Sequence, residues 1–294
     1  MKKKLHILAL TLILFSCDDM SMTINLSLNE HESLLVVNAN AEADKKLKVF
    51  VTKSIDPLSS NSFEYIDDAV VLLKEDMQLL DRLLFDKIKE CYLSNEVIES
   101  GKIYQLEVNH SDFLLASSEV YVPNIVEIQN AELGLISNDF RAFEFDVDDP
   151  LFIDNFYLLR IKGYVEDIEY EEDSIGFRWK DLWFESSDPS FDNNNFWGES
   201  YEGRRILFND QIFNGTKKTF YMDVSYWEEL DSVKLVLYSV SESFYKYHIS
   251  RILQNQNGTS EILGAEPVVV YNNIQNGFGV FAATSKSDLI IATD

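Results

Sequence analysis

The sequence predicts an all-β fold. Short runs of β-branched and aromatic residues recur along the chain and are separated by polar clusters and turn dipeptides such as Asn214-Gly215. In the runs Lys46–Thr52 and Lys102–Val108, apolar and polar residues alternate, as in a strand with one face in water. An apolar content of 46% with 13% aromatic residues is enough for a packed core.

The first half predicts a β-sandwich. Its strand-like runs are Ser33–Asn38, Lys46–Thr52, Ala69–Leu73 and Lys102–Val108. The segment Gln78–Tyr92 is ambiguous, because its apolar residues fall at helical spacing and periodicity alone favours a helix there.

The second half is also rich in strand-like runs. They are Ala142–Val147, Phe156–Tyr164, Gly176–Phe184, Lys218–Val224 and Val233–Val240. Pro123, in the extended stretch Glu119–Ile128, indicates a crossing between domains, and Phe244–Gln254 predicts a helix. We therefore expect one domain at residues 33–124 and a second, with one or two short helices, at 125–294.

Residues 1–16 have the features of a lipoprotein signal peptide. Lysines precede the apolar run Leu5–Phe15, which is too short to span a bilayer comfortably. Leu14, Ser16 and Cys17 fit a lipobox, in which small Ser16 admits the signal peptidase and Cys17 becomes the lipidated first residue. The alternative is an ordinary secretory peptide with an incidental cysteine.

The net charge limits the classes of binding partner, and the cysteine content limits the possible disulfides. The chain has 25 Lys and Arg against 50 Asp and Glu, a net charge of −25, which argues against nucleic acid and against adhesion to an anionic membrane surface. Cys91 is the other of the two cysteines, so a lipidated Cys17 leaves no intramolecular disulfide. We expect Cys91 to be a buried apolar residue.

The sequence contains no motif of a known catalytic class, such as HExxH, GxSxG or a P-loop, so we do not expect an enzyme. Oxygen ligands for calcium occur in the turn DPSFDNNN, at Asp188, Asp192 and Asn194. A second acidic run, DVDDP, contains Asp146, Asp148 and Asp149. The alternative is that these side chains cap their own turns.

Aromatic residues cluster between Trp179 and Tyr201. Among them, Trp183, Trp197 and Tyr201 are candidates for a binding patch that stacks on sugar rings or contacts a protein partner. The alternative is that the cluster belongs to the core of the sandwich and covers strand edges.

Several segments follow one another along the chain in a distinctive order. They are LLVVNA, AVVLL, Gly101–Val108, SSEVYVPNIVEI, ILFNDQIFNGTKKTF, VKLVLYSVSESFYKYHI and EPVVVYNNIQNGFGVFAA. In this order they resemble one uncharacterised lipoprotein family of the Bacteroidota, known as domain of unknown function 4249. The resemblance covers nearly all of the chain after Cys17, and Pro267–Ala282 is its most specific part. The chain departs from the family at Asn38–Asn40, where a glycine is more usual.

The resemblance implies a fold. The N-terminal domain would be an immunoglobulin-like or transthyretin-like sandwich, and the second domain would be a β-rich sandwich. Family strands run through part of Val70–Tyr92, so a β-meander is favoured there over the helix.

The resemblance also implies a setting. The family is one of outer-membrane lipoproteins whose genes often lie beside those of TonB-dependent receptors, and it has no assigned catalytic residues. Residues 17–32 would form the lipidated tether, and Asp18 and Asp19 resemble a signal for export to the cell surface. The alternative is that these two residues are only part of a solvated tether.

We therefore expect a non-enzymatic lipoprotein of the outer membrane, facing the cell exterior, that assists or helps assemble a TonB-dependent transporter. The alternative is an independent surface module that binds a glycan or a peptide, and a hydrolase is the third choice. Apart from the covalent lipid, the one cofactor considered is calcium.

Overall fold

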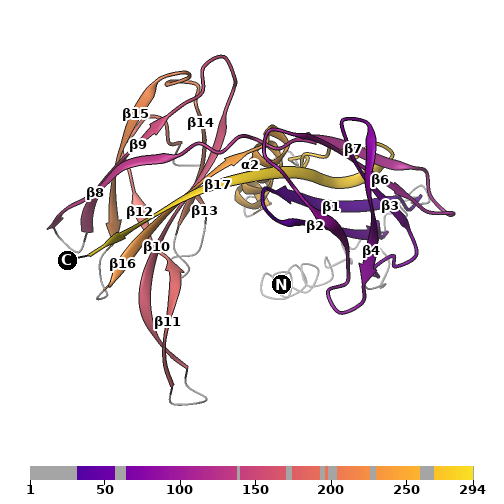
Figure 1. Ribbon diagram of the computed structural model, residues 1–294, viewed down its shortest axis with the longest axis horizontal. Coiled ribbons are helices and arrows are strands. Elements are labelled where there is room, and N and C mark those ends of the chain that lie inside the picture. Colours follow the sequence, from indigo (N-terminus) through magenta and orange to yellow (C-terminus); the bar gives the residue numbers. More distant parts are fainter. Residues whose placement is uncertain are drawn as a thin grey trace, which may run out of the picture. The chain divides into compact units, whose positions relative to one another are not determined.

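The regular secondary structure of the described residues is almost entirely β-strand, which confirms the predicted all-β class (Figure 1). The computed structural model describes residues 32–56, 64–137, 140–169, 174–192, 196–197, 204–225, 230–258 and 268–293. One sheet follows the order β13-β14-β10-β16-β17-β1-β2-β5-β4-β3-β6-β7, with β11 added beside β10. A second sheet has the order β12-β15-β9-β8.

The N-terminal half forms a sandwich because one strand belongs to two layers. Its strands are β1 (Leu35–Glu42), β2 (Lys46–Lys53), β3 (Val70–Glu75), β4 (Gln78–Asp86), β5 (Cys91–Val97), β6 (Ile103–Asn109) and β7 (Ala116–Tyr121). Residues Gln78–Leu83 of β4 pair with β3, whereas Leu84–Asp86 pair with β5. Side chains from both layers enclose an apolar core that includes Val37, Val49, Leu73 and Leu106.

The C-terminal half places two sheets face to face. Its strands are β8 (Ile128–Ser137), β9 (Phe140–Asp148), β10 (Phe156–Glu169), β11 (Ser174–Asp181), β12 (Phe184–Glu185), β13 (Phe196–Trp197), β14 (Arg205–Asn209), β15 (Lys217–Ser225), β16 (Ser232–Val240) and β17 (Gly277–Ala292). An aromatic group fills the space between the sheets. Its buried rings are Phe145, Tyr157, Phe191, Phe208, Phe213 and Phe220.

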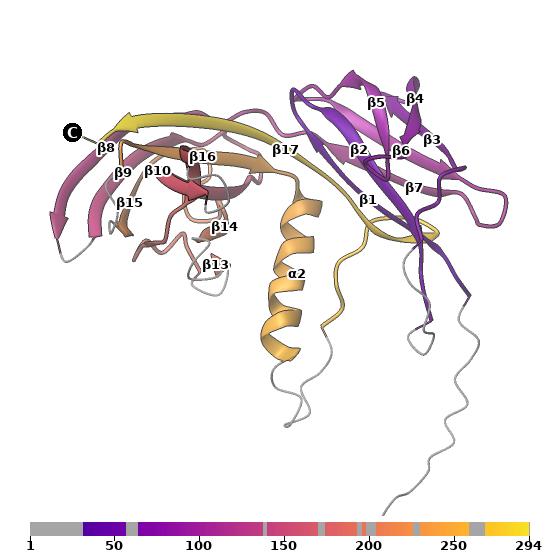
Figure 2. The same ribbon diagram turned by 90° about the horizontal axis from the view of Figure 1, so that it is seen from below.

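Strand β17 takes part in both halves, and Figures 1 and 2 show it running from β1 to β16. Gly277–Thr284 pair with β1 in parallel, and Thr284–Ala292 pair with β16 in antiparallel fashion. The sequence patterns do not predict this strand. Its middle is polar, yet Ser285 and Ser287 are buried.

The segment Gln78–Tyr92 forms the meander of β4 and β5, so the helix suggested by its spacing is wrong. The turn after β4 is closed by the Asp86 carboxylate, which accepts hydrogen bonds from the backbone N–H groups of Ile88 and Lys89 at 2.9 and 3.1 Å. These bonds also lower the pKa of Asp86. Ile88 is 95% exposed, so an apolar residue in the helical pattern does not reach a core.

The predicted helix at Phe244–Gln254 is confirmed as α2 (Glu242–Gly258), which leaves the end of β16 in Figure 2. The Ser241 hydroxyl accepts a hydrogen bond from the Phe244 N–H at 3.2 Å, as expected of an N-cap residue.

Near the predicted domain boundary, the chain passes from the N-terminal apolar core to the C-terminal one. Val122 belongs to the N-terminal core and Val126 to the C-terminal core. However, Ile274, Phe281 and Ala283, from the end of the chain, pack in the N-terminal core. The division at residue 124 stays a prediction.

Candidate functional site

The outer edge of β7 exposes backbone groups that none of the described strands covers. Strand β7 ends the larger sheet, and the Ser117 N–H and C=O point away from β6, towards Gln275. Because bonding direction alternates along an antiparallel strand, the N–H and C=O of Glu119 and Tyr121 also point outwards. Within the described part of the chain, Gln275 is the one residue that pairs with this edge, through Ser117.

A hollow of about 580 Å³ lies beside this edge. Ser118–Tyr121 of β7 line one side, and the other sides come from Ile153–Phe156, Ser239–Ser243 and the segment around Asn273. We name the outward backbone groups of Glu119 and Tyr121, together with this hollow, the edge site. A free strand edge beside a hollow can accept an extended peptide as an added strand.

The wall opposite β7 is held by two buried carboxylates. The Asp210 carboxylate accepts hydrogen bonds from the Asn155 backbone N–H at 2.8 Å and from the Asn214 side chain at 2.9 Å. Asp149 accepts one from the Tyr157 hydroxyl at 2.5 Å and one from the Gly215 N–H at 2.8 Å. These bonds fix the loop that carries Ile153 to the rest of the fold.

Burial raises the pKa of Asp149, and the neighbouring Asp210 carboxylate adds to the rise, while the bonds from Tyr157 and Gly215 oppose it. Burial and the hydrogen bond to Asp149 likewise raise the pKa of the Tyr157 hydroxyl. Because their oxygens are committed to holding the loop, we assign this pair a structural role.

The lining of the edge site is acidic. Glu119, Asp154 and Glu242 all border the hollow, and no lysine or arginine is among its lining residues. Glu119 accepts a hydrogen bond from Gln105 at 2.6 Å, and Glu242 pairs with Lys246 at 2.7 Å, which raises the pKa of that lysine. A segment that pairs with β7 would therefore be favoured by basic side chains.

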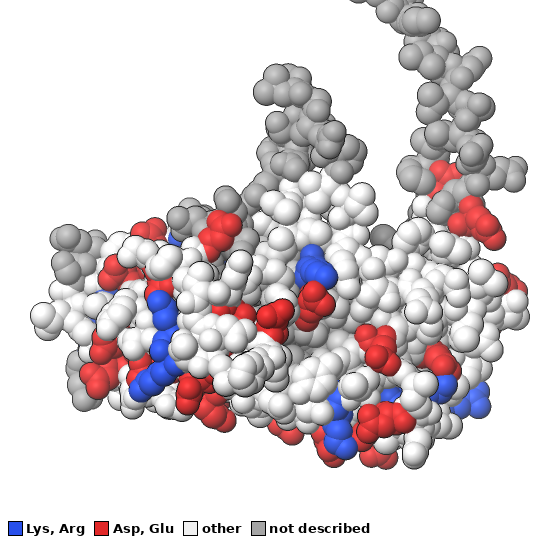
Figure 3. Space-filling view, turned by 90° about the horizontal axis from the view of Figure 1, so that it is seen from above, with Lys and Arg blue, Asp and Glu red and all other residues white. Residues whose placement is uncertain are grey.

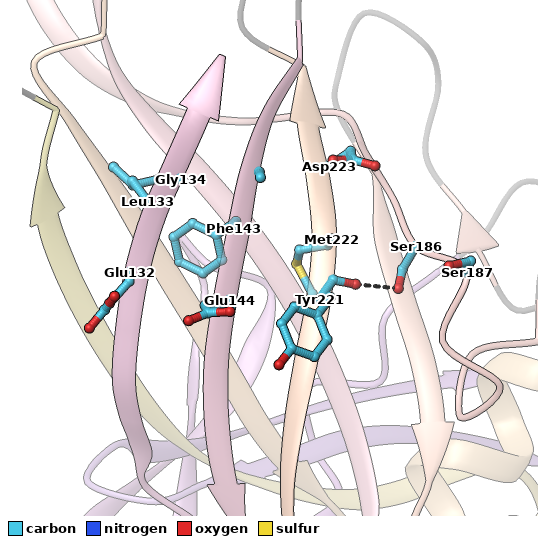
Figure 4. A pocket seen from close by; sticks show the side chains of 11 residues that line it. Glu132, Leu133, Gly134, Phe143, Glu144, Ser186, Ser187, Tyr221, Met222 and Asp223 are labelled. Carbon is cyan, nitrogen blue, oxygen red and sulfur yellow. Dashed lines mark hydrogen bonds between the residues drawn. The ribbon is translucent and has the colours of Figure 1, made fainter. Parts of the chain in front are cut away.

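A second hollow, of about 330 Å³, lies over the smaller sheet (Figure 4). Glu132, Glu144 and Tyr221 stand in register across β8, β9 and β15. The Ser186 hydroxyl donates to the Tyr221 carbonyl at 2.6 Å, so this hydroxyl has a structural partner. Among the described residues, no group of three or more His, Cys, Asp or Glu side chains is arranged to hold a metal ion.

The predicted calcium residues are only partly within the described chain. Asp188 pairs with Lys218 at 2.8 Å and accepts the Ser190 N–H at 2.8 Å. Burial by itself would raise the pKa of Asp188, but these bonds outweigh it and the pKa is lowered. Asp192 is exposed, and Asn194 lies outside the described residues. The calcium site stays a prediction.

The residues of the other acidic run have separate surroundings. Asp146 accepts hydrogen bonds from Lys217, Thr219 and Asn130, which together lower its pKa. Asp148 is exposed, whereas Asp149 is buried beside Tyr157. In this run, Asp146 therefore belongs to one hydrogen-bonded network, and Asp149 helps to anchor the loop described above.

The aromatic residues divide between core and surface. Phe184 and Phe191 are buried in the C-terminal core. Trp183 is half-buried, and the Arg204 guanidinium lies 3.8 Å from its ring centroid. Trp197 belongs to β13, but its side chain and the whole of Tyr201 lie outside what the structure describes. A patch of Trp183, Trp197 and Tyr201 stays a prediction.

The N-terminal candidates cannot be placed, since Leu14, Ser16, Cys17, Asp18 and Asp19 precede the described residues. Cys91 is buried with a free thiol, and burial raises its pKa. This placement fits the apolar role predicted for it.

The sequence is matched by a family model described as domain of unknown function (DUF4249), over residues 22–290. The chain belongs to this family. The match begins after Cys17 and includes strands β1–β16 of the DUF4249 fold described above and β17 as far as Ile290. The description of the family names no activity.

No curated protein matches this DUF4249 chain. Among the solved structures that match, one has 9% identity, over 70% of this chain and 88% of the other, with a TM-score of 0.21. It is described as the complete structure of manganese lipoxygenase of Gaeumannomyces graminis and a partial structure of zonadhesin of Komagataella pastoris. That score is too low to show a shared fold. In the part of the DUF4249 chain that is described, no helix is both long and apolar enough to cross a membrane.

Sequence patterns could not have located the edge site. The sequence indicates only an extended stretch at Glu119–Ile128, and whether a strand lies at an edge depends on pairings made by distant residues. The one useful signal was Pro123, which often marks the end of an edge strand.

Proposed function

We propose that this protein is a non-enzymatic lipoprotein of the outer membrane that acts as an accessory or assembly partner of a TonB-dependent transporter. The observation that carries the proposal is the free edge of β7 beside its hollow. In this proposal, an extended segment of the transporter adds to the sheet by pairing with the outward N–H and C=O groups of Glu119 and Tyr121.

The charge of the site supports a particular kind of segment. Glu119, Asp154 and Glu242 border the hollow, so an extended segment with lysine or arginine side chains is the best match. On the face shown in Figure 3, acidic side chains are spread widely with fewer basic ones among them, so acidic segments would be repelled over a larger area.

A lipid on Cys17 would make a weak interface sufficient. The lipid would confine the protein to the membrane that holds its partner, which raises the effective concentration of one for the other. Durable anchoring needs more than one acyl chain, so we propose a multiply acylated Cys17. Asp18 and Asp19 would then direct the protein to face the cell exterior.

The test is affinity purification of the tagged, lipidated, full-length protein from membranes in mild detergent, followed by mass spectrometry. We expect a TonB-dependent barrel at near-stoichiometric amounts, with cross-links to β7. A protein that purifies without a barrel would contradict the proposal.

A pair of variants tests the edge itself. Glu119→Pro removes the outward N–H without removing a bond to β6, since proline is tolerated where a strand edge faces outwards. Glu119→Ala removes the same side chain but keeps the N–H. We expect Glu119→Pro to lose the barrel and Glu119→Ala to retain it, with similar melting temperatures. Equal recovery of the barrel by both variants would exclude strand addition at this position.

The lipid anchor and the exposed location are tested separately. We expect Cys17→Ala to leave the membrane fraction, and we expect protease added to intact cells to digest the wild-type protein. Survival of the protein until the outer membrane is broken would indicate that it faces the periplasm.

The second candidate function is an independent surface module that binds a glycan or a peptide. A different part of the molecule favours it, a hollow lined by lysine and aromatic side chains beside α2.

A further inference from the structure

A hollow of about 720 Å³ lies between α2 and the outer face of strands β17, β1 and β2. Along β1, Val37 and Ala39 point into the core, so the alternate residues Asn38 and Asn40 point outwards to the hollow. Facing them across the hollow are Phe244, Tyr247 and His248 of α2. We name this feature the basic hollow.

The basic hollow gathers lysines that have no carboxylate partner in the part of the chain that the structure describes. Lys45, Lys46 and Lys48 line it and are exposed, and none forms an ion pair within the described residues. Elsewhere, lysines do pair, as Lys74 does with Glu107 at 2.5 Å and Lys102 with Glu75 at 2.7 Å.

In a chain with twice as many acidic as basic residues, three neighbouring cations without ion pairs are unexpected. One carboxylate, Glu42, also lines the hollow, so the lining remains positive. Such a local field attracts an anion.

Aromatic rings and amide side chains also line the basic hollow. Phe50 is 38% exposed on β2, directly opposite Asn38 in the β1–β2 register, and Val280 of β17 is the other neighbour of Asn38. On the helix side, the rings of Phe244 and His248 lie 4.3 Å apart. Burial, with Arg251 and Arg205 nearby, lowers the pKa of His248 to about 4, so its ring is neutral at physiological pH.

Together these groups match one class of ligand. Aromatic rings stack on the C–H faces of sugars, side-chain amides form hydrogen bonds with hydroxyl groups, and lysines form ion pairs with carboxylate or sulfate groups. An inorganic anion would use the lysines alone, and a neutral sugar would leave them unused. A volume of about 720 Å³ is in the range of pockets that hold small ligands.

We propose that the basic hollow binds an anionic sugar, a ring that carries a carboxylate or a sulfate group. Lys45, Lys46 and Lys48 contact the anionic group. Phe50 and Tyr247 contact the ring, and Asn38 binds a hydroxyl. The inference deepens the second candidate function and rests on it, and it does not depend on a transporter partner.

The test is isothermal titration of the full-length lipidated protein in mild detergent with three probes. These are an oligogalacturonate, which carries carboxylates, a sulfated keratan oligosaccharide, which carries sulfates and no carboxylate, and a neutral oligosaccharide of the same length. We expect at least one of the two anionic probes to bind, with an affinity that falls as salt is added, and we expect the neutral probe to bind much more weakly. Uronate and sulfate are thereby distinguished.

The matched variants are Lys46→Gln with Lys48→Gln, and Lys286→Gln as the control. Lys286 is an exposed lysine of β17 outside the lining. Each lost charged contact should weaken binding about tenfold, and the control should bind like the wild type. Lys46, Lys48 and Lys286 are all exposed, so their replacement should not change the melting temperature of the protein. Phe50→Ala should also weaken binding without altering the salt dependence.

Four results would overturn the proposal. Three are no heat with either anionic probe, equal affinity for the neutral probe, and unchanged affinity in the double lysine variant. The fourth is competition by sodium sulfate as strong as that by the oligosaccharide, because the sugar ring would then contribute nothing. The double lysine variant should still recover any barrel in affinity purification, so failure here is distinguishable from failure at the edge site.

Discussion

Ser117 and Gln275 exchange two backbone hydrogen bonds, at 3.3 and 2.8 Å, although 158 residues separate them. This pair ties the edge strand of the N-terminal half to the segment that leads into β17. The pairing stops at once, and the segment instead turns to bond Asn273 to Phe281. The edge site therefore exists because, among the described residues, the segment around Gln275 closes the β7 edge at Ser117 and leaves the next two outward positions, Glu119 and Tyr121, open.

The close pairing of β1 with β17 requires glycine at position 279. Gly279 has a φ of 113°, and a Cβ atom there would lie 2.1 Å from the Val37 carbonyl oxygen. We expect Gly279→Ala to lower the free energy of unfolding by about 2 kcal/mol or more, measured by urea denaturation. Gly134→Ala is the control, because the atom nearest to its Cβ would be the Ala142 methyl at 3.1 Å, and its φ is not in the left-handed region. A larger loss in the control would contradict this account.

Phe220 is the centre of the aromatic core in the C-terminal half. Its ring centroid lies 5.2 Å from that of Phe191 and 5.5 Å from that of Phe208, and the residue is fully buried. Phe220→Ala should cost about 3–5 kcal/mol, through lost apolar burial and a residual cavity. The neighbouring Tyr221 is 62% exposed, so Tyr221→Ala should stay within about 0.5 kcal/mol of wild type. Similar losses for both would place Phe220 outside the core.

Asp181 holds two arginines at the surface of the larger sheet. Its side chain is 7% exposed and pairs with Arg160 at 2.6 Å and with Arg205 at 3.1 Å. Asp181→Asn should cost about 2 to 3 kcal/mol because the arginines lose their counter-charge while still partly buried. The longer and more exposed Lys234–Asp288 pair, at 3.9 Å, is the comparison, and Asp288→Asn should change stability by under about 0.5 kcal/mol. Thermal melts of both variants would check the difference.

Protonation of His248 should lower the free energy of unfolding in mild acid. Its pKa is lowered to about 4 in the folded chain, by burial first and then by Arg251 and Arg205, against about 6.5 for an unfolded histidine. Between those values the unfolded chain binds the proton more readily than the folded chain does. The stability that depends on a neutral His248 is therefore fully present above about pH 6.5 and is lost as the pH falls towards 4. His248→Phe should show a shallower decline in melting temperature over that interval. Parallel curves for the two proteins would rule out His248 as a source.

The sequence by itself determined the kind of structure this protein has. Alternating runs such as Lys46–Thr52 predict strands because one face of each must be buried, and Phe244–Gln254 predicts a helix because its apolar residues share one side. Family membership was also recognisable, through the motifs that end at Ala283. These are local properties, set by neighbours along the chain.

Only the tertiary structure decided which strands meet. The helical spacing of Gln78–Tyr92 was overridden because pairing with β3 and β5 satisfies the backbone, leaving Ile88 in water. Strand β17, polar at its middle, is held by partners on both sides. The edge site and the basic hollow each join residues far apart in sequence, Glu119 with Asn273 and Lys48 with Tyr247. Such sites depend on long-range pairing and register, which residue spacing does not encode.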